Sequence, residues 1–299
     1  MYEEIIRVAE EQGCSATRDI PLAKYTSFKI GGPAALLVEP NSVDSLSAIL
    51  KACRNSGVDP LVLGRGSNVL VPDEGVDNVV LLMGDAFSKI EYCGSSMVRA
   101  QAGASLINLC RFALEYKLGG LEFAYGIPGS VGGGIYMNAG AYGGEMKDVV
   151  MVVSYVDRDG NRGSWQGDEI GLGYRHSNFM GTDLIITSAL FKLSHRDPDV
   201  IKSKMDGLMQ RRRDKQPLNF PSAGSTFKRP EGYFAGKLIQ DAGLMGYTVR
   251  GAMDSDKHAG FVVNRGGATA ADVRALIAHV QETVRQQFGV VLEPEVRIL

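Results

Sequence analysis

Apolar and polar positions along the first two-thirds of the chain follow two different spacings. Apolar residues spaced three and four apart predict helices at 43–56 and 106–116. Asn41 and Ser42 can cap the first of these helices, and Gly57 can end it. Short runs rich in Val, Leu and Ile predict strands at 34–39, 61–63, 79–83, 97–102, 149–157 and 184–193. This mixture predicts an α/β pattern in which strands and helices share a core.

A long helical pattern follows these strands and indicates a domain boundary. Asp197 and Pro198 begin a helix, because Pro fits the first helical turn. The pattern runs to about Lys215, and Pro217 follows it. We therefore expect one part of the chain to end near residue 200.

The remaining residues predict a smaller mixed part. A long amphipathic helix is predicted at 270–288, with Thr269 as its cap. A shorter helix is predicted at 234–242. The last ten residues, 290–299, predict a strand that is interrupted at Pro294.

Composition and charge exclude several classes of protein. The 299 residues are 44% hydrophobic and 22% charged, which is typical of a globular protein. A formal net charge of -2 provides no basic excess for binding nucleic acid. The four cysteines and four histidines show no metal-ligand spacing, so no metal site is expected. An acidic N-terminus and the lack of an apolar run of about 20 residues predict a cytoplasmic protein without a membrane span.

Two glycine-rich segments are candidates for binding a ligand through the backbone. The first, GRGSN at 64–68, follows a predicted strand, and its N–H groups can approach a phosphate. A tight turn after a strand explains this segment equally well. The second, GIPGSVGGG at 126–134, carries a large backbone-entropy cost on folding, which indicates that a ligand packs against it. With NAG at 138–140, these segments predict a planar cofactor with a pyrophosphate tail.

Three polar residues that lie far apart in the sequence are candidates for a reaction centre. They are Arg175, Ser225 and Glu295. Taken singly, each has an ordinary explanation as a surface cation, a turn residue or a solvated acid. Only their convergence in space gives them chemical meaning.

A basic cluster at 211–215 stands at the C-terminal end of a predicted helix. Cations there are favoured by the helix dipole, so a solvated helix end explains the cluster. Together with Lys228 and Arg229, the cluster can also hold a diphosphate.

These residues occur in a series of motifs whose order resembles that of one enzyme family. The motifs are YTSFKIGG at 25–32, GRGSNVLV at 64–71, GIPGSVGG at 126–133, NAGAYGGE at 138–145, GYRHSNF at 173–179, KQP at 215–217, AGSTFKRP at 223–230, KHAGFVVN at 257–264 and EPEV at 293–296. Over nearly its whole length the sequence resembles the UDP-N-acetylenolpyruvoylglucosamine reductase family, in the shorter form that lacks an inserted loop with a Tyr.

The resemblance implies an α+β fold with a two-part FAD-binding module of the vanillyl-alcohol-oxidase (PCMH) type, followed by an α/β substrate domain. The expected parts are 1–85 and 86–198 for the FAD module and 199–299 for the substrate domain. The resemblance also implies noncovalent FAD. The implied FAD contacts are Gly64, Arg65, Gly66, Ser67, Asn68, Gly126, Ile127, Pro128, Gly129, Ser130, Gly133, Asn138, Gly140 and Arg297.

The family reaction implied by the resemblance has two halves. NADPH reduces FAD, and the enolpyruvyl ether of a UDP-sugar then takes the hydride to give UDP-N-acetylmuramate for peptidoglycan synthesis. Arg175 would stabilise negative charge on the substrate carboxylate. Glu295 would assist if it carries a proton, and Ser225 would deliver a proton to C2.

The remaining implied residues concern the substrate and the flavin ring. Tyr174, Lys215, Lys228 and Arg229 are the expected substrate contacts. Arg297, two positions after Glu295, would lie on the same face of a strand and support charge at flavin N1 and O2.

Two other functions remain open at this stage. Another FAD-dependent oxidase of the same fold, acting on a hydroxy acid or a sugar, would consume oxygen without NADPH. A noncatalytic nucleotide-sugar-binding protein would bind ligand and oxidise no NADPH. The sequence leaves the oligomeric state unknown, with a monomer plausible.

Overall fold

Segments that are distant in the sequence pack together in this protein. The computed structural model describes residues 2–299 and divides into two units, each with its own core. Unit 1 comprises the chain up to Asp19, Ala35–Arg65 and Asn78–Gln210, and unit 2 comprises Ile20–Ala34, Gly66–Asp77 and Arg211–Leu299. Unit 2 therefore takes two N-terminal segments in addition to the C-terminal third, a grouping that contiguous boundaries at residues 85 and 198 do not reproduce.

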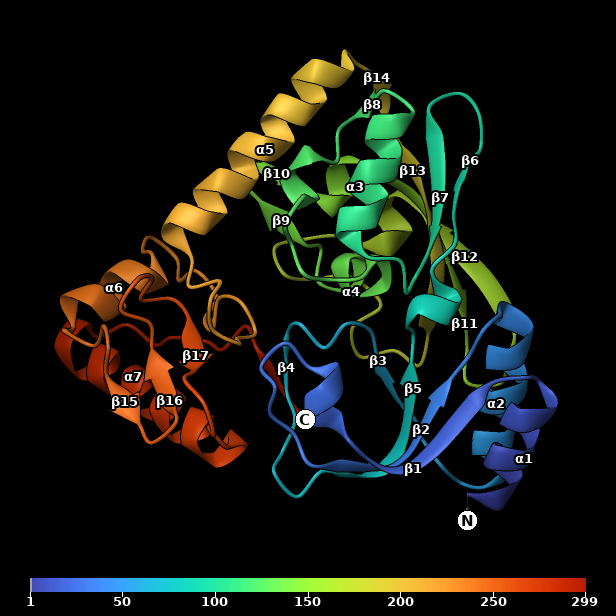
Figure 1. The fold of residues 1–299 in the computed structure, drawn as a ribbon, viewed down its shortest axis with the longest axis horizontal. Coiled ribbons are helices and arrows are strands. Elements are labelled where there is room, and N and C mark those ends of the chain that lie inside the picture. Colours follow the sequence, from blue (N-terminus) through green and yellow to red (C-terminus); the bar gives the residue numbers. More distant parts are fainter. Residues whose placement is uncertain (1) are drawn as a thin grey trace. The chain divides into compact units, whose positions relative to one another are not determined.

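The first sheet has four strands in the order β1-β2-β5-β3 (Figure 1). Their bounds are Ser15–Pro21 (β1), Pro33–Glu39 (β2), Leu61–Leu63 (β3) and Val76–Leu82 (β5). β5 ends in four consecutive buried residues because it is an inner strand, with β3 parallel to it on one side. Helices α1 (Glu3–Glu11) and α2 (Val43–Asn55) pack on each other. The Ser42 hydroxyl accepts the Ser45 N–H at 3.1 Å and caps α2.

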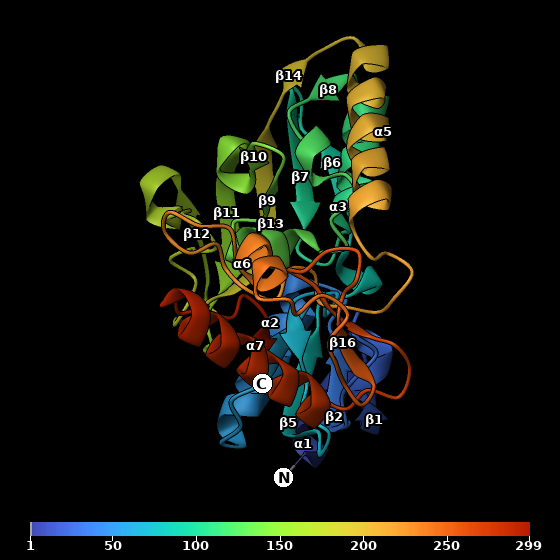
Figure 2. The same ribbon diagram turned by 90° about the vertical axis from the view of Figure 1, so that its left-hand side faces the viewer.

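The second sheet has five antiparallel strands in the order β12-β11-β13-β7-β6, of which β11, β13 and β7 lie side by side in Figure 2. Their bounds are Ile90–Tyr92 (β6), Met97–Gln101 (β7), Val150–Val156 (β11), Arg162–Gln166 (β12) and Ile185–Lys192 (β13). Helix α4 (Val131–Tyr136) packs on β13 and β7. Helix α3 (Leu106–Glu115) begins at Ser105, whose hydroxyl accepts the Asn108 N–H. The chain between β7 and β11 thus contains α3 and α4, and α4 packs on the sheet.

Short elements complete unit 1. Two-residue strand pairs join β8 (Leu118–Gly119) to β14 (Ser194–His195) and β9 (Gly140–Ala141) to β10 (Gly144–Glu145). Single 3-10 turns lie at Leu22–Tyr25, Asp85–Phe87, Glu122–Ala124, Met146–Asp148 and Gly167–Ile170, the first of them belonging to unit 2. These turns and strand pairs connect the longer helices and strands along the chain.

Unit 2 is built around helix α7 (Ala270–Phe288), which contacts a small antiparallel sheet (Figure 1). The sheet contains β15 (Thr248–Val249), β16 (Ala252–Asp254) and β17 (Val262–Asn264), and α6 (Ala235–Asp241) packs on α7. β4 (Val69–Leu70) pairs in parallel with β18 (Arg297–Ile298). Helix α5 (Pro198–Lys215) leads along the chain from unit 1 into unit 2. Phe28, Ile30 and Leu70 belong to the same core as the buried face of α7.

Most of the predicted elements are confirmed. The helices at 43–56, 106–116, 234–242 and 270–288 form as α2, α3, α6 and α7, and the helix from Pro198 to Lys215 forms as α5. The six predicted strands correspond to β2, β3, β5, β7, β11 and β13.

The predicted C-terminal strand is wrong over most of its length. Only Arg297–Ile298 forms a strand, and the residues before it carry a single β-bridge, between Pro294 and Phe227. Pro294 lacks an N–H, and the segment instead pairs one backbone group at a time with neighbouring loops. The inference that Glu295 and Arg297 share one strand face therefore does not hold.

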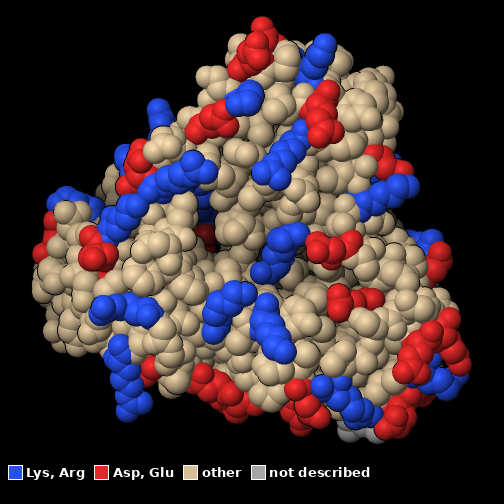
Figure 3. All heavy atoms as spheres, in the orientation of Figure 1, with Lys and Arg blue, Asp and Glu red and all other residues tan. Residues whose placement is uncertain are grey.

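Two general expectations have structural counterparts. Within residues 2–299, no helix is both long and apolar enough to cross a membrane. Lys and Arg side chains are interspersed with Asp and Glu on the face shown in Figure 3, consistent with 32 basic and 34 acidic residues.

Candidate active site

The GRGSN segment forms a turn directly after β3 that only glycine permits. Gly66 has a φ of +56°, and a Cβ there would lie 2.2 Å from the carbonyl oxygen of Tyr25. The carbonyl of Gly66 accepts the N–H of Ser27 at 3.0 Å. Gly66 therefore fixes the turn through both its conformation and its close approach to neighbouring backbone.

The backbone amides of this turn fit the predicted phosphate ligand. Among residues 2–299, the N–H groups of residues 64–67 have no hydrogen-bond acceptor. Successive amides of this kind in a turn form a positive concavity that suits an anion. The Arg65 guanidinium lies 3.1 Å from Asp85, which is exposed. The donor set thus fits a pyrophosphate, and it consists mainly of backbone.

The two glycine-rich segments meet in unit 1. A Cβ on Gly64 would lie 2.5 Å from the hydroxyl oxygen of Ser130, so the first turn packs against the second segment. Ser130 is buried and accepts the N–H of Gly133 at 3.4 Å as the cap of α4. The N–H of Leu106 donates to the carbonyl of Gly129 at 3.0 Å. These contacts show that the two segments are neighbours and that 129–133 is tied to other backbone.

Asn138 occupies a different position from the one expected of a cofactor contact. Its residue is 0% exposed, and its side chain is engaged with protein groups. A fully buried residue presents no surface to a ligand in this conformation. The structure therefore does not support Asn138 as a direct FAD contact. Gly140, in β9, is half-buried, and a Cβ there would lie 2.8 Å from Cβ of Glu145.

Tyr174 and Arg175 lie at the tip of a tight turn in unit 1. Gly173 and His176 exchange two backbone hydrogen bonds, of 3.0 Å and 3.2 Å, and enclose these two residues. Tyr174 is 56% exposed. The Arg175 guanidinium lies 5.2 Å from the centre of the Tyr174 ring. The turn thus exposes the Tyr174 side chain and leaves Arg175 half-buried.

The backbone segments that carry Ser225 and Glu295 pair with each other in unit 2. The N–H of Glu295 donates to the carbonyl of Thr226 at 2.8 Å, and the N–H of Lys228 donates to the carbonyl of Glu293 at 2.8 Å. The segments 226–228 and 293–295 therefore run antiparallel. Ser225 immediately precedes the first segment, and Glu295 belongs to the second. Arg175 belongs to the other unit, and its meeting with this pair stays a prediction.

Asn68 links the glycine-rich turn to the C-terminal segment within unit 2. Its side-chain amide donates to the carbonyl of Glu295 at 3.1 Å, and its own carbonyl accepts the N–H of Arg297 at 3.0 Å. Asn68 thus holds the backbone on both sides of Val296. This contact uses one amide hydrogen, and the FAD contact predicted for Asn68 remains untested.

His258 belongs to the same neighbourhood and was not identified from the sequence. Its Nδ1 accepts the N–H of Gly260 at 3.1 Å, and a Cβ on Gly260 would lie 3.2 Å from the imidazole and 3.8 Å from the Ser225 hydroxyl. Burial lowers the pKa of His258, and the charge of Lys215 lowers it further. The KHAGFVVN motif contains this residue, but a single His in an apolar motif gives no chemical signal by itself.

The basic residues expected to hold a diphosphate already have protein contacts. The Lys228 ammonium lies 2.5 Å from the carboxylate of Glu293. The Arg229 guanidinium lies 4.0 Å from the ring centre of Phe234 and donates to the carbonyl of Tyr233. A diphosphate would compete with Glu293 for Lys228, so the substrate contacts proposed for this loop involve exchange of partners.

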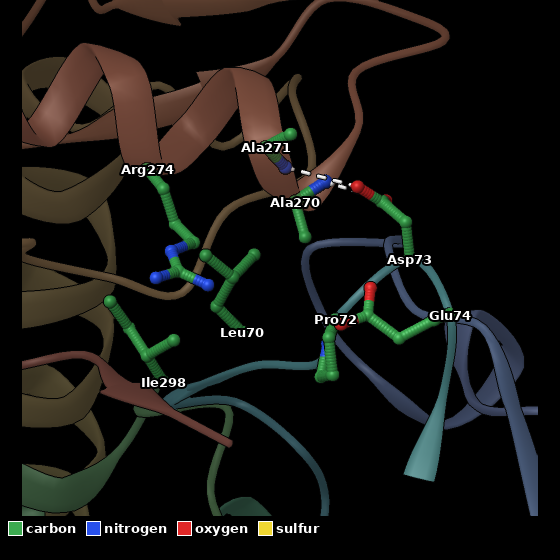
Figure 4. A pocket seen from close by; sticks show the side chains of 8 residues that line it. All are labelled: Leu70, Pro72, Asp73, Glu74, Ala270, Ala271, Arg274 and Ile298. Atoms are coloured by element: carbon green, nitrogen blue, oxygen red, sulfur yellow. Dashed lines mark hydrogen bonds between the residues drawn. The ribbon is translucent and has the colours of Figure 1, made fainter.

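A pocket of about 250 Å³ in unit 2 lies apart from these residues (Figure 4). It lies at the start of α7, where Asp73 accepts the N–H groups of Ala270 and Ala271 at 2.7 Å and 3.0 Å. The helix end is therefore already neutralised by a carboxylate of the chain. Of the predicted site residues, none lines this pocket within the described chain.

Comparisons with known proteins find matches for both parts of this chain. The family model described as the C-terminal domain of UDP-N-acetylenolpyruvoylglucosamine reductase matches residues 216–299, and one described as an FAD-binding domain matches residues 34–162. UDP-N-acetylenolpyruvoylglucosamine reductase of Clostridium botulinum (strain 657) is 47% identical over 94% of this chain and 91% of its own length. That of Clostridium perfringens (strain SM101) is 48% identical over 95% of this chain and 92% of its own.

Solved structures confirm the α+β fold with an FAD-binding module of the vanillyl-alcohol-oxidase type. The reductase of Thermus caldophilus has a TM-score of 0.81 and 35% identity, over 95% of this chain and 98% of that one. A variant of berberine bridge enzyme has a TM-score of 0.52 and 17% identity, over 66% of this chain, and shares only the fold. The chain therefore belongs to the UDP-N-acetylenolpyruvoylglucosamine reductase family of FAD-dependent oxidoreductases.

Proposed function

We propose that this protein reduces UDP-N-acetylglucosamine enolpyruvate to UDP-N-acetylmuramate, with NADPH as the electron donor and noncovalent FAD as the carrier, in peptidoglycan precursor synthesis. The observation that carries the proposal is the backbone pairing between the segment that follows Ser225 and the segment that holds Glu295, in a chain 47% identical to a reductase of that name. A hydride and a proton must both reach the enolpyruvyl group, and Ser225 and Glu295 are proposed to handle the proton.

The residues that would hold FAD are those of the two glycine-rich segments. The open amides of 64–67 would bind the pyrophosphate, and the loop at Gly126–Ser130 would lie against the cofactor. When bound, FAD would supply the hydride for the vinyl carbon C3 of the substrate. Arg297 is proposed to support negative charge on the flavin ring.

The chain's own residues would control charge and protons on the substrate. Hydride arrival at C3 pushes electron density through C2 into the carboxylate. The Arg175 guanidinium would stabilise that charge, and a protonated Glu295 would donate a hydrogen bond to the same group. Ser225 would then deliver a proton to C2. Tyr174, Lys215, Lys228 and Arg229 are proposed to hold the nucleotide-sugar.

An anaerobic spectroscopic titration of the purified holoprotein tests the proposal. We expect a yellow protein that NADPH bleaches and that UDP-N-acetylglucosamine enolpyruvate recolours, with one equivalent of each. Bleaching without recolouring would remove this substrate. Steady oxygen consumption with a simple hydroxy acid or sugar would instead indicate an oxidase of the same fold, and binding of the nucleotide-sugar without NADPH oxidation would indicate a binding protein.

A further inference from the structure

We infer that Asn138 is a positioning residue that holds the turn presenting Arg175. The inference rests on the proposed role of Arg175 in substrate reduction. It assigns Asn138 an indirect function in place of contact with the cofactor. The contacts on which it depends lie entirely within unit 1.

The turn itself is unfavourable for the residue that it carries. Arg175 stands second between Gly173 and His176, with a φ of +51°, in the left-handed region that glycine or asparagine usually fills. Such a conformation persists where the surrounding structure holds it. The turn therefore needs ties outside its own two backbone hydrogen bonds.

Two buried side-chain contacts supply those ties. The Asn138 side-chain amide donates to the carbonyl of Gly173 at 2.8 Å. The Ser177 hydroxyl donates to the carbonyl of Tyr136 at 2.8 Å. Asn138 and Ser177 are both 0% exposed. The segment at the end of α4 thus holds the turn on both sides of Arg175, at Gly173 and at Ser177.

The orientation of the Asn138 amide follows from its partners. Its nitrogen faces two acceptors, the carbonyl of Gly173 and the carboxylate of Glu145, each at 2.8 Å. Its oxygen accepts the N–H of Lys147 at 3.0 Å. A flipped amide would place oxygen against both acceptors, so only this orientation satisfies the group. Glu145 in turn lies 2.7 Å from the Lys147 ammonium, which balances its charge.

The sequence places asparagine here for a second reason. Asn138 itself has a φ of +41°, a conformation that Asn tolerates better than most residues. Aspartate tolerates the same backbone and can accept the Lys147 N–H, but an ionised carboxylate has no hydrogen to donate to Gly173. Asn138→Asp therefore removes the tie to the turn, and it also sets a carboxylate oxygen against the carboxylate of Glu145.

The test measures the two half-reactions separately by anaerobic stopped flow on the holoprotein. In Asn138→Asp we expect flavin reduction by NADPH within about twofold of the wild type. Reoxidation by UDP-N-acetylglucosamine enolpyruvate should slow by about 10- to 100-fold, because a misplacement of about 1 Å at a charge-stabilising group has this effect. Asn55→Asp, at an exposed position on unit 1, introduces the same charge and should leave both rates unchanged.

A double-mutant cycle separates positioning from general damage. If Asn138 acts through Arg175, Asn138→Asp should slow reoxidation by no more than about twofold in an Arg175→Ala background. An equal slowing in both backgrounds would overturn the inference, as would an Asn138→Asp variant that matches Asn55→Asp. If Asn138→Asp fails to retain FAD, Ser177→Ala enters the same cycle with the same expectation, since it removes the other tie without a charge.

The cycle also separates this inference from the proposed function. If Arg175→Ala alone leaves reoxidation unchanged, the role of Arg175 fails and the inference fails with it. If Arg175→Ala slows reoxidation and the variants of Asn138 and Ser177 do not, only the inference is overturned.

Discussion

A serine hydroxyl is a poor acid in water, so the role proposed for Ser225 depends on the order of events. After hydride arrival the C2 centre is strongly basic and can take a proton from a weak acid. Ser225→Ala should therefore slow reoxidation of reduced flavin by the enolpyruvyl substrate by about 10²- to 10⁴-fold, the usual contribution of a positioned proton donor. Flavin reduction by NADPH should change by less than about twofold.

The matched control for this variant is Ser203→Ala, at an exposed position of α5. It removes the same hydroxyl group away from the paired 225–228 and 293–295 segments. Stopped-flow absorbance of the flavin measures both half-reactions in each variant. An equal loss in the two half-reactions of Ser225→Ala would contradict its role as the proton donor.

Asp254 is a buried carboxyl group that carries no catalytic role in this scheme. It lies in β16, is 1% exposed, and its Oδ2 has no hydrogen-bond partner among the described residues. Burial raises the pKa of Asp254 to about 8, although the N–H of Ser255 opposes the shift. The folded protein therefore holds a proton here that the unfolded chain releases near pH 3.8.

This difference in proton binding gives a pH dependence of known sign. Between about pH 4 and pH 8 the folded state binds more protons at Asp254 than the unfolded state, so stability falls as pH rises through that window. The limiting slope for one group is about 1.4 kcal/mol per pH unit. Asp254→Asn removes the titration and retains the neutral shape. Urea unfolding at pH 5 and pH 8 should show that the free energy of unfolding of the variant, relative to the wild type, is higher at pH 8 than at pH 5. The same difference at both pH values would contradict the assignment.

At the scale of elements, the turn after β3 depends on one glycine. Gly66→Ala would put a methyl group 2.2 Å from the carbonyl oxygen of Tyr25, in addition to straining a backbone with a φ of +56°. Gly57→Ala provides the control, because Gly57 has a similar φ of +68° and no atom within 4 Å of the added methyl. The difference between these variants isolates the steric clash.

We expect Gly66→Ala to lower the free energy of unfolding by about 1–3 kcal/mol more than Gly57→Ala, which is the usual cost of overpacking. It should also lower the FAD content of the purified protein, because the amides of 64–67 move with the turn. Urea titration and the ratio of flavin to protein absorbance measure these effects. Equal stability and full flavin content in the two variants would show that the turn accommodates the added methyl group and would contradict the prediction.

The elements predicted best from the sequence are those whose signals are local. Helix α7 begins and ends as predicted because Thr269 forms a capping box with Asp272 and Gly289 takes a left-handed conformation. β1 escaped prediction because Ser15–Pro21 has no alternation of apolar residues and is mostly exposed. The predicted C-terminal strand does not form because its backbone groups pair one at a time with distant segments instead of in one long ladder.

The site shows the same limit at the level of chemistry. The glycine-rich segments could be found from the sequence because so many glycines lose a large amount of backbone entropy on folding. The structure places Gly64 against Ser130. The function of Asn138 could not be found, because a motif cannot show whether an amide faces a ligand or a neighbouring carbonyl. His258 was missed for a similar reason, since its relation to Ser225 exists only in the folded unit 2.

At the scale of the whole molecule, the C-terminal third does not contain all of its own core. Phe28, Ile30 and Leu70 are buried in the same cluster as Val273 and Leu276 of α7. β18 also needs β4 as its only ladder partner among residues 2–299. A piece cut at the predicted boundary would therefore expose the apolar face that these N-terminal segments cover.

This arrangement predicts that a fragment of residues 199–299 does not fold alone. Without 20–34 and 66–77 it loses the buried side chains of Phe28 and Leu70 and the backbone partners of its last residues. We expect no cooperative thermal transition by circular dichroism and poor dispersion of its amide NMR signals. In the full chain, Phe28→Ala should cost about 3–5 kcal/mol of unfolding free energy, and Phe288→Ala, at an exposed position of α7, much less. A fragment that melts in one sharp transition would contradict this prediction. It would mean that the C-terminal third forms a stable core without the N-terminal segments.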